Sequence, residues 1–537
     1  MMMRIEVGIV TRRLAVKREF AHQTRADQSV KRIIDGSPRG PRVAFVERRP
    51  ELFDGGMLGM GQQVLEDEEA LRRPAHPGTL ESRFNPLPGI NLRHQSNLRN
   101  NSKLADVPDS RKGFLPKRRR EESRRGTQSA CATLVCKLAI RMKLAPARQA
   151  AFGALLAVDR GAWSAEALAA KSAHLDARDA GLALDIVFGT LRRRGEIDFI
   201  IARCSKRPVE QLDPIVRIAI EMAIYQLWFL DRVPAHAAVN DSVELARRAG
   251  KASASAFVNA VLRRALREQI AAPTAASTPN WLMERWAAQY GPETAQGIAQ
   301  ASLTTPERYI RVGNGIPPEG AEATGVPGCY ALPEGDSGPY RFQDIGSQAV
   351  VPLLDLHPGH TFLDLCAAPG NKTAQGLETP VQAIACDLHL SRARTLLPLG
   401  IPLVVLDATG PLPFSKRFDR ILVDAPCSGT GTLARNPEIK WRVQPADIAD
   451  LQRRQIAILG NALRQLAEDG LLVYSTCSLE REENEDVIAA SGAVVVGSMQ
   501  RIPGRDPGDG FFAAVLAGAS HGRLARVICG ESYLMGR

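Results

Sequence analysis

Apolar residues recur every three to four positions from Ala147 to Gln269, the spacing of helices that each bury one face. The stretch from Leu212 to Leu230 is apolar almost throughout, but it contains charged residues, so it predicts a buried helix and not a membrane span. His236 lies near the start of the next helical stretch, where we expect a turn or capping residue and not a ligand. The pattern predicts an all-helical domain over residues 142–270.

From residue 341 onwards, short apolar runs alternate with helical stretches. The runs that predict strands are 361–365, 381–387, 403–407, 420–424 and 470–475. Strands separated by helices indicate a mainly parallel sheet with both faces covered, so we assign residues 341–537 to the α/β class. The intervening residues 271–340 predict a linker or small connecting subdomain, with a helix around Trp281–Tyr290 and a short strand at Arg308–Val312.

Residues 1–141 show no sustained period, and prolines and glycines interrupt each candidate element. They contain 28 Lys and Arg against 16 Asp and Glu, a net charge of +12, whereas the remaining residues carry 41 and 42, a net charge of −1. We therefore expect a basic, disordered leader. A mis-called start codon, with Met142 as the true first residue, is the preferred interpretation. A basic arm that grips RNA and an appendage without a role are the alternatives.

The composition excludes several classes of protein. Hydrophobic residues make up 45% of the chain and charged residues 24%, as in ordinary globular proteins. No run approaches the ~18 consecutive apolar residues of a membrane helix, and the charged start does not resemble a secretory signal. The nine cysteines have neither the density of a disulfide scaffold nor a metal-binding spacing. We expect a cytoplasmic protein with free thiols, no membrane partner and no metal.

The first predicted strand leads into a run of small residues that opens a helix, Asp364–Thr373. Small residues let the backbone approach a ligand closely, and a helix N-terminus favours a carboxylate or phosphate. Asp387 and Asp407 end the next two strands, where they could accept hydrogen bonds from a ribose and an adenine amino group. S-adenosylmethionine, a nucleoside with a charged tail, suits these positions. Another nucleotide, or simple capping and turn roles for the aspartates, stays open.

Two later strands end next to cysteines, in Asp424–Gly431 and Tyr474–Leu479. A free cysteine is most often a small buried apolar residue. Cysteine is also the soft nucleophile that adds to a pyrimidine ring once its pKa is lowered. Because Cys427 and Cys477 follow strands beside the same expected pocket, they are candidate catalytic residues. The structural role is assigned to Cys204, Cys329, Cys386 and Cys529.

Segments in both halves of the chain resemble one family. Tyr225–Leu227, Asp231–Asn240 and Phe257–Arg264 resemble the antitermination factor NusB and, more closely, the NusB-like domain at the front of RsmB (Sun/Fmu) family ribosomal RNA cytosine methyltransferases. The other motifs that resemble this RsmB/NOP class are Phe342–Gln348, Asp364–Thr373, Asp424–Gly431, Arg435–Trp441, Tyr474–Glu483 and Asp509–Ala514. The resemblance covers roughly residues 142–515.

The resemblance implies a Rossmann-like, S-adenosylmethionine-dependent methyltransferase domain preceded by an all-helical, RNA-contacting NusB-like domain. The implied reaction forms 5-methylcytosine in small-subunit (16S) ribosomal RNA, and we expect a monomer. Cys477 is implied to be the nucleophile that adds to carbon 6 of the cytosine, Asp424 to hold the base, and Cys427 to assist release of the adduct. In DNA cytosine methyltransferases the cysteine after a proline is the nucleophile, and that logic would select Cys427.

The implied cofactor contacts are Cys366, Ala367, Ala368, Pro369, Gly370, Asn371, Lys372, Asp387, Asp407 and Asp424. The side chains predicted to contact RNA phosphates are Lys372, Arg435, Lys440 and Arg442. Two features depart from the family pattern: Asn371 replaces the usual glycine, and Ser391–Leu403 is short, which puts the fit around Asp387 and Asp407 in question. The alternative functions are the same chemistry on transfer RNA, or an RNA-binding antitermination module with an inactive transferase domain. The paired cysteines argue against an inactive domain.

Overall fold

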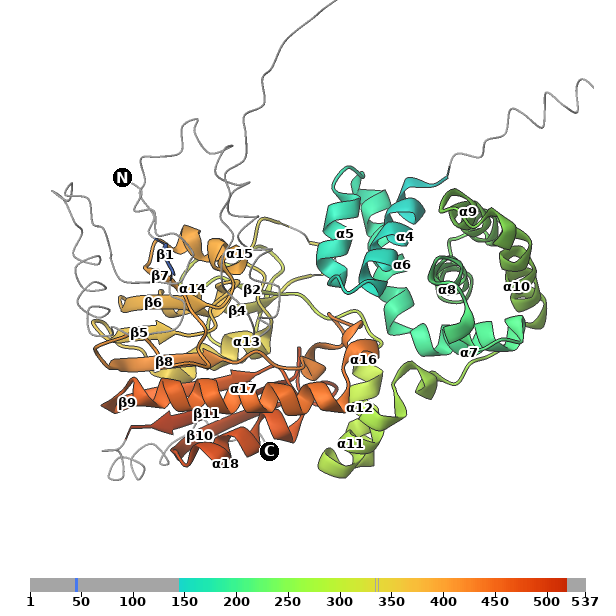
Figure 1. Cartoon of the computed structure of the whole chain (residues 1–537). Helices are drawn as coiled ribbons and strands as arrows, with labels where there is room; N and C mark the ends of the chain where they lie inside the picture. Colours follow the sequence, from blue (N-terminus) through green and yellow to red (C-terminus); the bar gives the residue numbers. More distant parts are fainter. Residues whose placement is uncertain (1–43, 47–143, 334, 337, 519–537) are drawn as a thin grey trace, which may run out of the picture. The chain divides into compact units, whose positions relative to one another are not determined.

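The computed structural model describes residues 44–46, 144–333, 335–336 and 338–518 (Figure 1). The predicted start at Met142 lies outside the described residues, as does nearly all of the predicted leader. Its described part is strand β1, Ala44–Val46, which pairs antiparallel with strand β7. At this strand the structure therefore departs from the expectation that the leader has no regular structure. An unpaired strand edge offers backbone groups to any segment that reaches it.

The described residues from 146 to 268 are helical, as the apolar period predicts. The helices are α4 Pro146–Asp159, α5 Ser164–Ser172, α6 Ala177–Arg192, α7 Arg194–Ser205, α8 Pro214–Phe229, α9 Ala235–Arg248 and α10 Ser255–Glu268. Helix α8 begins where Asp213 accepts a hydrogen bond from the backbone of Ile215, 3.0 Å away. It packs against α4, α6, α7, α9 and α10, which explains why its sequence is apolar on nearly every side (Figure 1). No helix among the described residues is long and apolar enough to cross a membrane.

The second half of the chain forms an eight-stranded sheet in the order β1-β7-β6-β5-β8-β9-β11-β10. Its remaining strands are β5 Thr361–Asp364, β6 Gln382–Asp387, β7 Leu403–Val405, β8 Phe418–Asp424, β9 Leu466–Thr476, β10 Val494–Arg501 and β11 Phe511–Ala517. Strands β5 to β9 pair in parallel, which confirms the predicted α/β class. The antiparallel strands β10 and β11, which close one edge, did not follow from the alternation of strands and helices.

Helices cover both faces of this sheet with their apolar sides. On one face, residues of α17 (Pro445–Arg464) and α18 (Glu485–Ser491) pack on one set of strand side chains, including Leu363 and Ile421. On the other face, α13 (Ile345–Val350) packs on the alternate set, including Phe362 and Leu422. Burial on both faces is the condition under which parallel strands are stable, and it leaves the strand ends free to carry polar residues.

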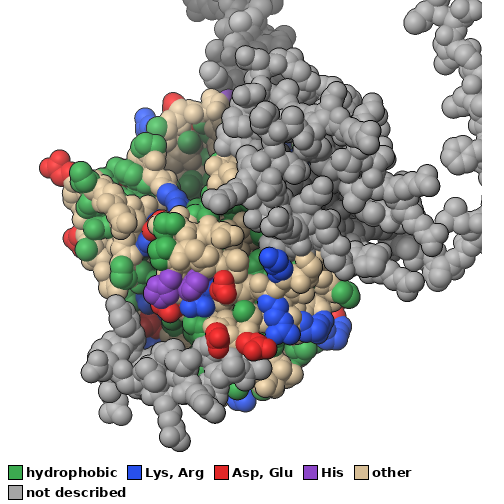
Figure 2. Space-filling view, turned by 90° about the vertical axis from the view of Figure 1, so that its left-hand side faces the viewer, with side chains coloured by type: hydrophobic (Ala, Val, Ile, Leu, Met, Phe, Trp, Pro, Cys, Tyr) green, Lys and Arg blue, Asp and Glu red, His purple; other side chains and the backbone are tan. Residues whose placement is uncertain are grey.

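The connecting region contains two helices, α11 Asn280–Tyr290 and α12 Pro292–Ala301, and a small antiparallel sheet. The strands of that sheet are β2 Tyr309–Arg311, β3 Glu322–Ala323 and β4 Cys329–Ala331. The predicted helix and the predicted strand of this region are both present. Figure 2 shows one face of the molecule, on which acidic and basic side chains of the described residues lie near one another. That mixture agrees with the near-zero net charge of the chain after residue 141.

Candidate active site

The two candidate cysteines meet at the carboxyl ends of neighbouring parallel strands. Cys427 lies three residues after β8, and Cys477 directly follows β9. Their sulfur atoms are 3.4 Å apart. The hydrogen bond with the Cys477 thiol, together with burial, raises the pKa of Cys427 well above its usual value. Of the two thiols, Cys427 is therefore held in its neutral form.

Asp424, the last residue of β8, lies in a short chain of polar contacts. One of its carboxylate oxygens accepts a hydrogen bond from the Ser475 hydroxyl (2.8 Å), and the other pairs with the Lys372 ammonium (2.8 Å). Burial opposes the charge of Lys372, but the neighbouring Asp424 carboxylate outweighs burial and raises the pKa of this lysine. Lys372 also lies 5.1 Å from the centre of the Phe511 ring. Its side chain therefore points to Asp424.

The segment between β5 and helix α14 (Asn371–Gly376) forms the expected loop of small residues. The backbone N–H of Ala368 donates to the Asp387 carboxylate (3.2 Å), and Arg392 donates to the Ala368 carbonyl (2.8 Å). Gly370 has a φ of +108°, and a Cβ atom there would lie 2.7 Å from Leu396. Asn371, the departure from the family pattern, donates from its side chain to the Phe342 carbonyl (3.2 Å). The loop is thus tied to the neighbouring segments on several sides.

The candidate ligand aspartates Asp387, at the end of β6, and Asp407, two residues after β7, differ in their partners. Asp387 also accepts from the His389 backbone (3.1 Å), and the exposed Asp407 accepts from the backbone and hydroxyl of Thr409 (2.9 and 2.7 Å). These are the turn contacts that the sequence left open as an alternative for both. The short 391–403 segment forms a brief α15 (Leu390–Ala393) and a 3-10 turn, and it still places β7 beside β6.

Asp364 keeps one carboxylate oxygen unused. It is fully buried; one oxygen accepts from the Thr373 hydroxyl (2.7 Å), and the other has no partner among the described residues. Burial raises the pKa of Asp364 to about 7. A buried acceptor without a donor calls for an explanation, and a cationic group of a ligand would supply the missing donor. A nucleoside with an ammonium-bearing tail therefore fits these residues.

All four side chains predicted to contact phosphates have partners inside the protein, and that of Lys372 is Asp424. Arg435 pairs with Asp344 (2.9 Å) and Asp509 (2.7 Å), and Arg442 donates to backbone carbonyls of the helical region, those of Val158 and Ala162. The prediction is not supported for these two arginines.

For Lys440 the prediction of a phosphate contact is wrong. Its side chain is 1% exposed, and the ammonium donates to the carbonyls of Arg192 (3.0 Å) and Ser277 (2.9 Å). A lysine in a loop-rich motif is usually solvated, so the sequence alone does not indicate this burial. Lys440 joins α16 (Ile439–Arg442) to the helical region.

The pH dependence of stability provides a test of this burial. Burial lowers the pKa of Lys440 to about 7, and the charges of Arg192 and Arg193 add to the effect. In the unfolded chain the pKa is about 10.4, so between about pH 7 and 10 the unfolded state binds more protons. The free energy of unfolding is expected to rise over that interval by up to roughly 1 kcal/mol per pH unit, with no gain below about pH 7. Urea unfolding should show this rise in the wild type and a flatter profile in Lys440→Met; equal slopes would contradict the assignment.

Comparisons with known proteins agree with the two regions of the fold, the helical region and the region that contains the parallel sheet. Residues 145–267 match the NusB family, and residues 351–517 match the family described as 16S rRNA methyltransferase RsmB/F. The chain is 33% identical over 390 residues to ribosomal RNA small subunit methyltransferase B of Citrobacter koseri, covering 63% of this chain and 91% of that protein. It is 31% identical over 365 residues to the probable ribosomal RNA small subunit methyltransferase B of Bacillus subtilis, covering 60% and 81%. The crystal structure of PH0851 shares the fold, with a TM-score of 0.60 and 21% identity over 69% of this chain and 98% of that one.

Proposed function

The chain belongs to the RsmB/F family of 16S ribosomal RNA methyltransferases, and we propose that it methylates carbon 5 of a cytosine in small-subunit ribosomal RNA. Family membership supports methylation of ribosomal RNA with S-adenosylmethionine. The observation that carries the choice of carbon 5 is the pair of thiols, 3.4 Å apart, beside the ion pair of Asp424 and Lys372. Carbon 5 of cytosine is a poor nucleophile, and a thiolate added at carbon 6 removes that difficulty.

The loop 366–372 and the strand-end carboxylates Asp364, Asp387 and Asp407 would hold the cofactor. S-adenosylmethionine, when bound, supplies the electrophilic methyl group that carbon 5 accepts. The unused oxygen of Asp364 suits the ammonium of its amino-acid tail, and Asp387 and Asp407 retain acceptor capacity for hydroxyl and amino groups. Lys372 lies in the same loop, but its ammonium group pairs with Asp424 and is not assigned to the cofactor.

In the proposed mechanism, the Cys477 thiolate forms a bond to carbon 6 and the ring electrons shift towards carbon 5 and the ring nitrogen. Asp424 hydrogen-bonds the base and supports protonation of that nitrogen, while Lys372 keeps the Asp424 carboxylate in place. After methylation, the carbon 5 proton leaves to a water molecule, and Cys427 assists this step. The bond between sulfur and carbon 6 then breaks, its electron pair returns to Cys477, and the ring double bond re-forms. The target base must be accessible, as in a loop or a flipped-out nucleotide.

We assign the helical residues 142–270 to RNA recruitment, residues 271–340 to connection and residues 341–537 to catalysis. The contacts of α16 support a fixed docking of the helical residues 142–270 on the catalytic residues 341–537. Glu438, just before α16, accepts hydrogen bonds from the backbone and hydroxyl of Ser164 (2.8 and 2.9 Å), and the Trp441 indole donates to the Leu191 carbonyl (2.9 Å). Such docking would present RNA bound by the helices to the cysteines.

Methyl transfer from labelled S-adenosylmethionine to unmodified small-subunit ribosomal RNA tests the proposal, with nucleosides analysed after digestion. We expect 5-methylcytidine as the product. Transfer RNA is the second substrate in the same assay, and methylation of transfer RNA alone would reassign the substrate. Tight RNA binding without any methyl transfer would instead favour an RNA-binding module.

Asp364→Asn is expected to weaken S-adenosylmethionine binding by about tenfold or more, because the amide cannot provide a negative charge for the ammonium. Wild-type affinity is also expected to fall as the pH drops below about 7, where Asp364 becomes protonated, and the variant should lack this dependence. Calorimetric titration measures both effects. Asp355→Asn, at an exposed carboxylate, is the control and should bind like the wild type. Unchanged binding by Asp364→Asn would remove this residue from the cofactor site.

A further inference from the structure

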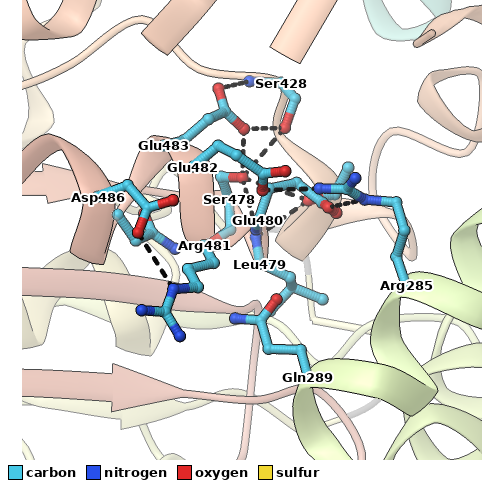
Figure 3. Close-up of polar contacts among 12 residues, drawn as sticks. Arg285, Gln289, Ser428, Ser478, Leu479, Glu480, Arg481, Glu482, Glu483 and Asp486 are labelled. Atoms are coloured by element: carbon cyan, nitrogen blue, oxygen red, sulfur yellow. Dashed lines mark hydrogen bonds and ion pairs between the residues drawn. The ribbon is translucent and has the colours of Figure 1, made fainter. Parts of the chain in front are cut away.

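One buried carboxylate contacts the residues next to both cysteines. Glu483 lies in the short 3-10 turn Arg481–Glu483 after β9 and is 0% exposed. Its oxygen Oε1 accepts from the backbone of Ser428 (2.8 Å), and its oxygen Oε2 accepts from the hydroxyls of Ser428 and Ser478. Figure 3 shows the carboxylate of Glu483 turned toward both serines. Because Ser428 follows Cys427 and Ser478 follows Cys477, a single side chain holds both cysteine loops.

A side chain of helix α17 also holds the loop that contains Cys427. The side-chain amide of Gln455 donates to Glu483 (3.0 Å) and to the carbonyl of Pro426 (2.9 Å). Cys427 is therefore fixed on both sides, through Pro426 and through Ser428. The two serine hydroxyls are themselves 3.1 Å apart, and the backbone of Gly431 donates to the Cys477 carbonyl (2.9 Å).

The loop that follows Cys477 is also held by residues of the connecting region. Arg285 of α11 donates to Glu480 (2.7 Å) and Glu482 (2.7 Å), as Figure 3 shows, and Trp286 donates to the other oxygen of Glu480 (3.1 Å). The hydroxyl of Tyr290 donates to the Leu479 carbonyl (2.6 Å). These contacts reach the outer residues of the loop, whereas the Glu483 carboxylate reaches the residue next to the cysteine.

Glu483 has no ion-pair partner among the described residues, although an unpaired buried carboxylate is costly. Burial raises its pKa, and the hydrogen bonds from Ser428, Ser478 and Gln455 act in the opposite direction. A carboxylate offers about four acceptor positions on two oxygens, so it can bind donors from three segments at once. A neutral side chain of this length has fewer acceptors. The use of a carboxylate here therefore favours a role in which Glu483 keeps these segments at a fixed spacing.

We propose that Glu483 is the positioning residue that sets the separation of Cys427 and Cys477, by accepting hydrogen bonds from Ser428 and Ser478. This inference rests on the proposed function, in which one thiol adds to the base and the other assists release. Misplacement by about 1 Å of groups that act in turn on one base can cost about 100-fold in rate. Substrate binding does not need the two thiols at a fixed distance.

The test compares wild type, Glu483→Gln, Glu483→Ala and the matched control Asp486→Asn, all as full-length protein. Asp486 lies three residues further along the chain, and its exposed carboxylate pairs with the exposed Arg481. In methyl transfer to small-subunit ribosomal RNA, we expect kcat to fall by about 30-fold in Glu483→Gln and by about 100-fold in Glu483→Ala. The glutamine is the milder change because its carbonyl oxygen still accepts from the serines. We expect KM to change by less than about threefold in both, and the control to match the wild type.

A second measurement does not depend on activity. The pH profile of Cys427 alkylation by iodoacetamide, followed by mass spectrometry of its peptide without RNA, reports the contact between the thiols. That contact raises the pKa of Cys427, so its loss in Glu483→Gln should move the alkylation profile to lower pH.

The outcomes separate the two proposals. A wild type without methyl transfer, combined with a shifted alkylation profile in Glu483→Gln, would refute the function while supporting the positioning role. An unshifted profile, or a loss of activity that appears in KM with kcat preserved, would overturn the positioning role. Should Glu483→Ala fail to fold, Glu483→Gln and Ser478→Ala carry the same comparison.

Discussion

Cys477→Ala is expected to abolish methyl transfer, with kcat reduced by roughly 1,000-fold or more, because in the proposed mechanism Cys477 supplies the covalent bond at carbon 6. Binding of S-adenosylmethionine should be unchanged, since Cys477 contributes no predicted cofactor contact. Cys427→Ala should behave differently: addition to the base proceeds, release is slow, and a covalent complex of protein and RNA accumulates. Transfer of labelled methyl groups measures the first effect, and a denaturing gel shows the second.

Two further variants control this experiment. Cys204→Ala removes a buried thiol of α7, outside the site, and should retain activity. The double variant Cys427→Ala/Cys477→Ala should form no covalent complex, because the adduct requires Cys477. If Cys477→Ala stays active while Cys427→Ala is dead, the two roles are exchanged, as in DNA cytosine methyltransferases.

Asp424→Asn is expected to lower kcat by about 100-fold or more, the second-largest effect. The amide cannot support the protonated ring nitrogen as a carboxylate does, and Lys372 loses its ion-pair partner at 2.8 Å. Ser475→Ala removes the other partner of Asp424 and should cost only about tenfold, since the charge remains. Steady-state kinetics with saturating cofactor measure both variants.

The matched control is Asp419→Asn, on the same strand β8 but at its opposite end. Asp419 accepts hydrogen bonds from the backbone and hydroxyl of Thr361 (2.8 and 2.7 Å), so its loss should lower stability and leave kcat near the wild-type value. Thermal unfolding and kcat are measured together. An equal loss of kcat in both variants would attribute the effect to weakening of the strand and not to chemistry.

Much of the fold followed from the order of residues. The helical period from Ala147 to Gln269 and the alternation after residue 341 depend on local spacing, and both appear in the structure. The parallel strands β5 to β9 have long apolar runs because helices cover both faces. The antiparallel strands β10 and β11 were not predicted, because a pairing that closes a sheet edge depends on contacts between segments distant in sequence.

For the site, the sequence by itself determined which residue types end each strand, because strand and helix periods are local properties of the chain. It thereby indicated two cysteines and four aspartates at one edge of a sheet. Only the tertiary structure decided that Lys372 turns to Asp424, that Lys440 is buried, and that Glu483 reaches Ser428, 55 residues away. The physical reason is that a charged side chain selects its partner only after packing has brought distant segments together and removed the water that would otherwise solvate it.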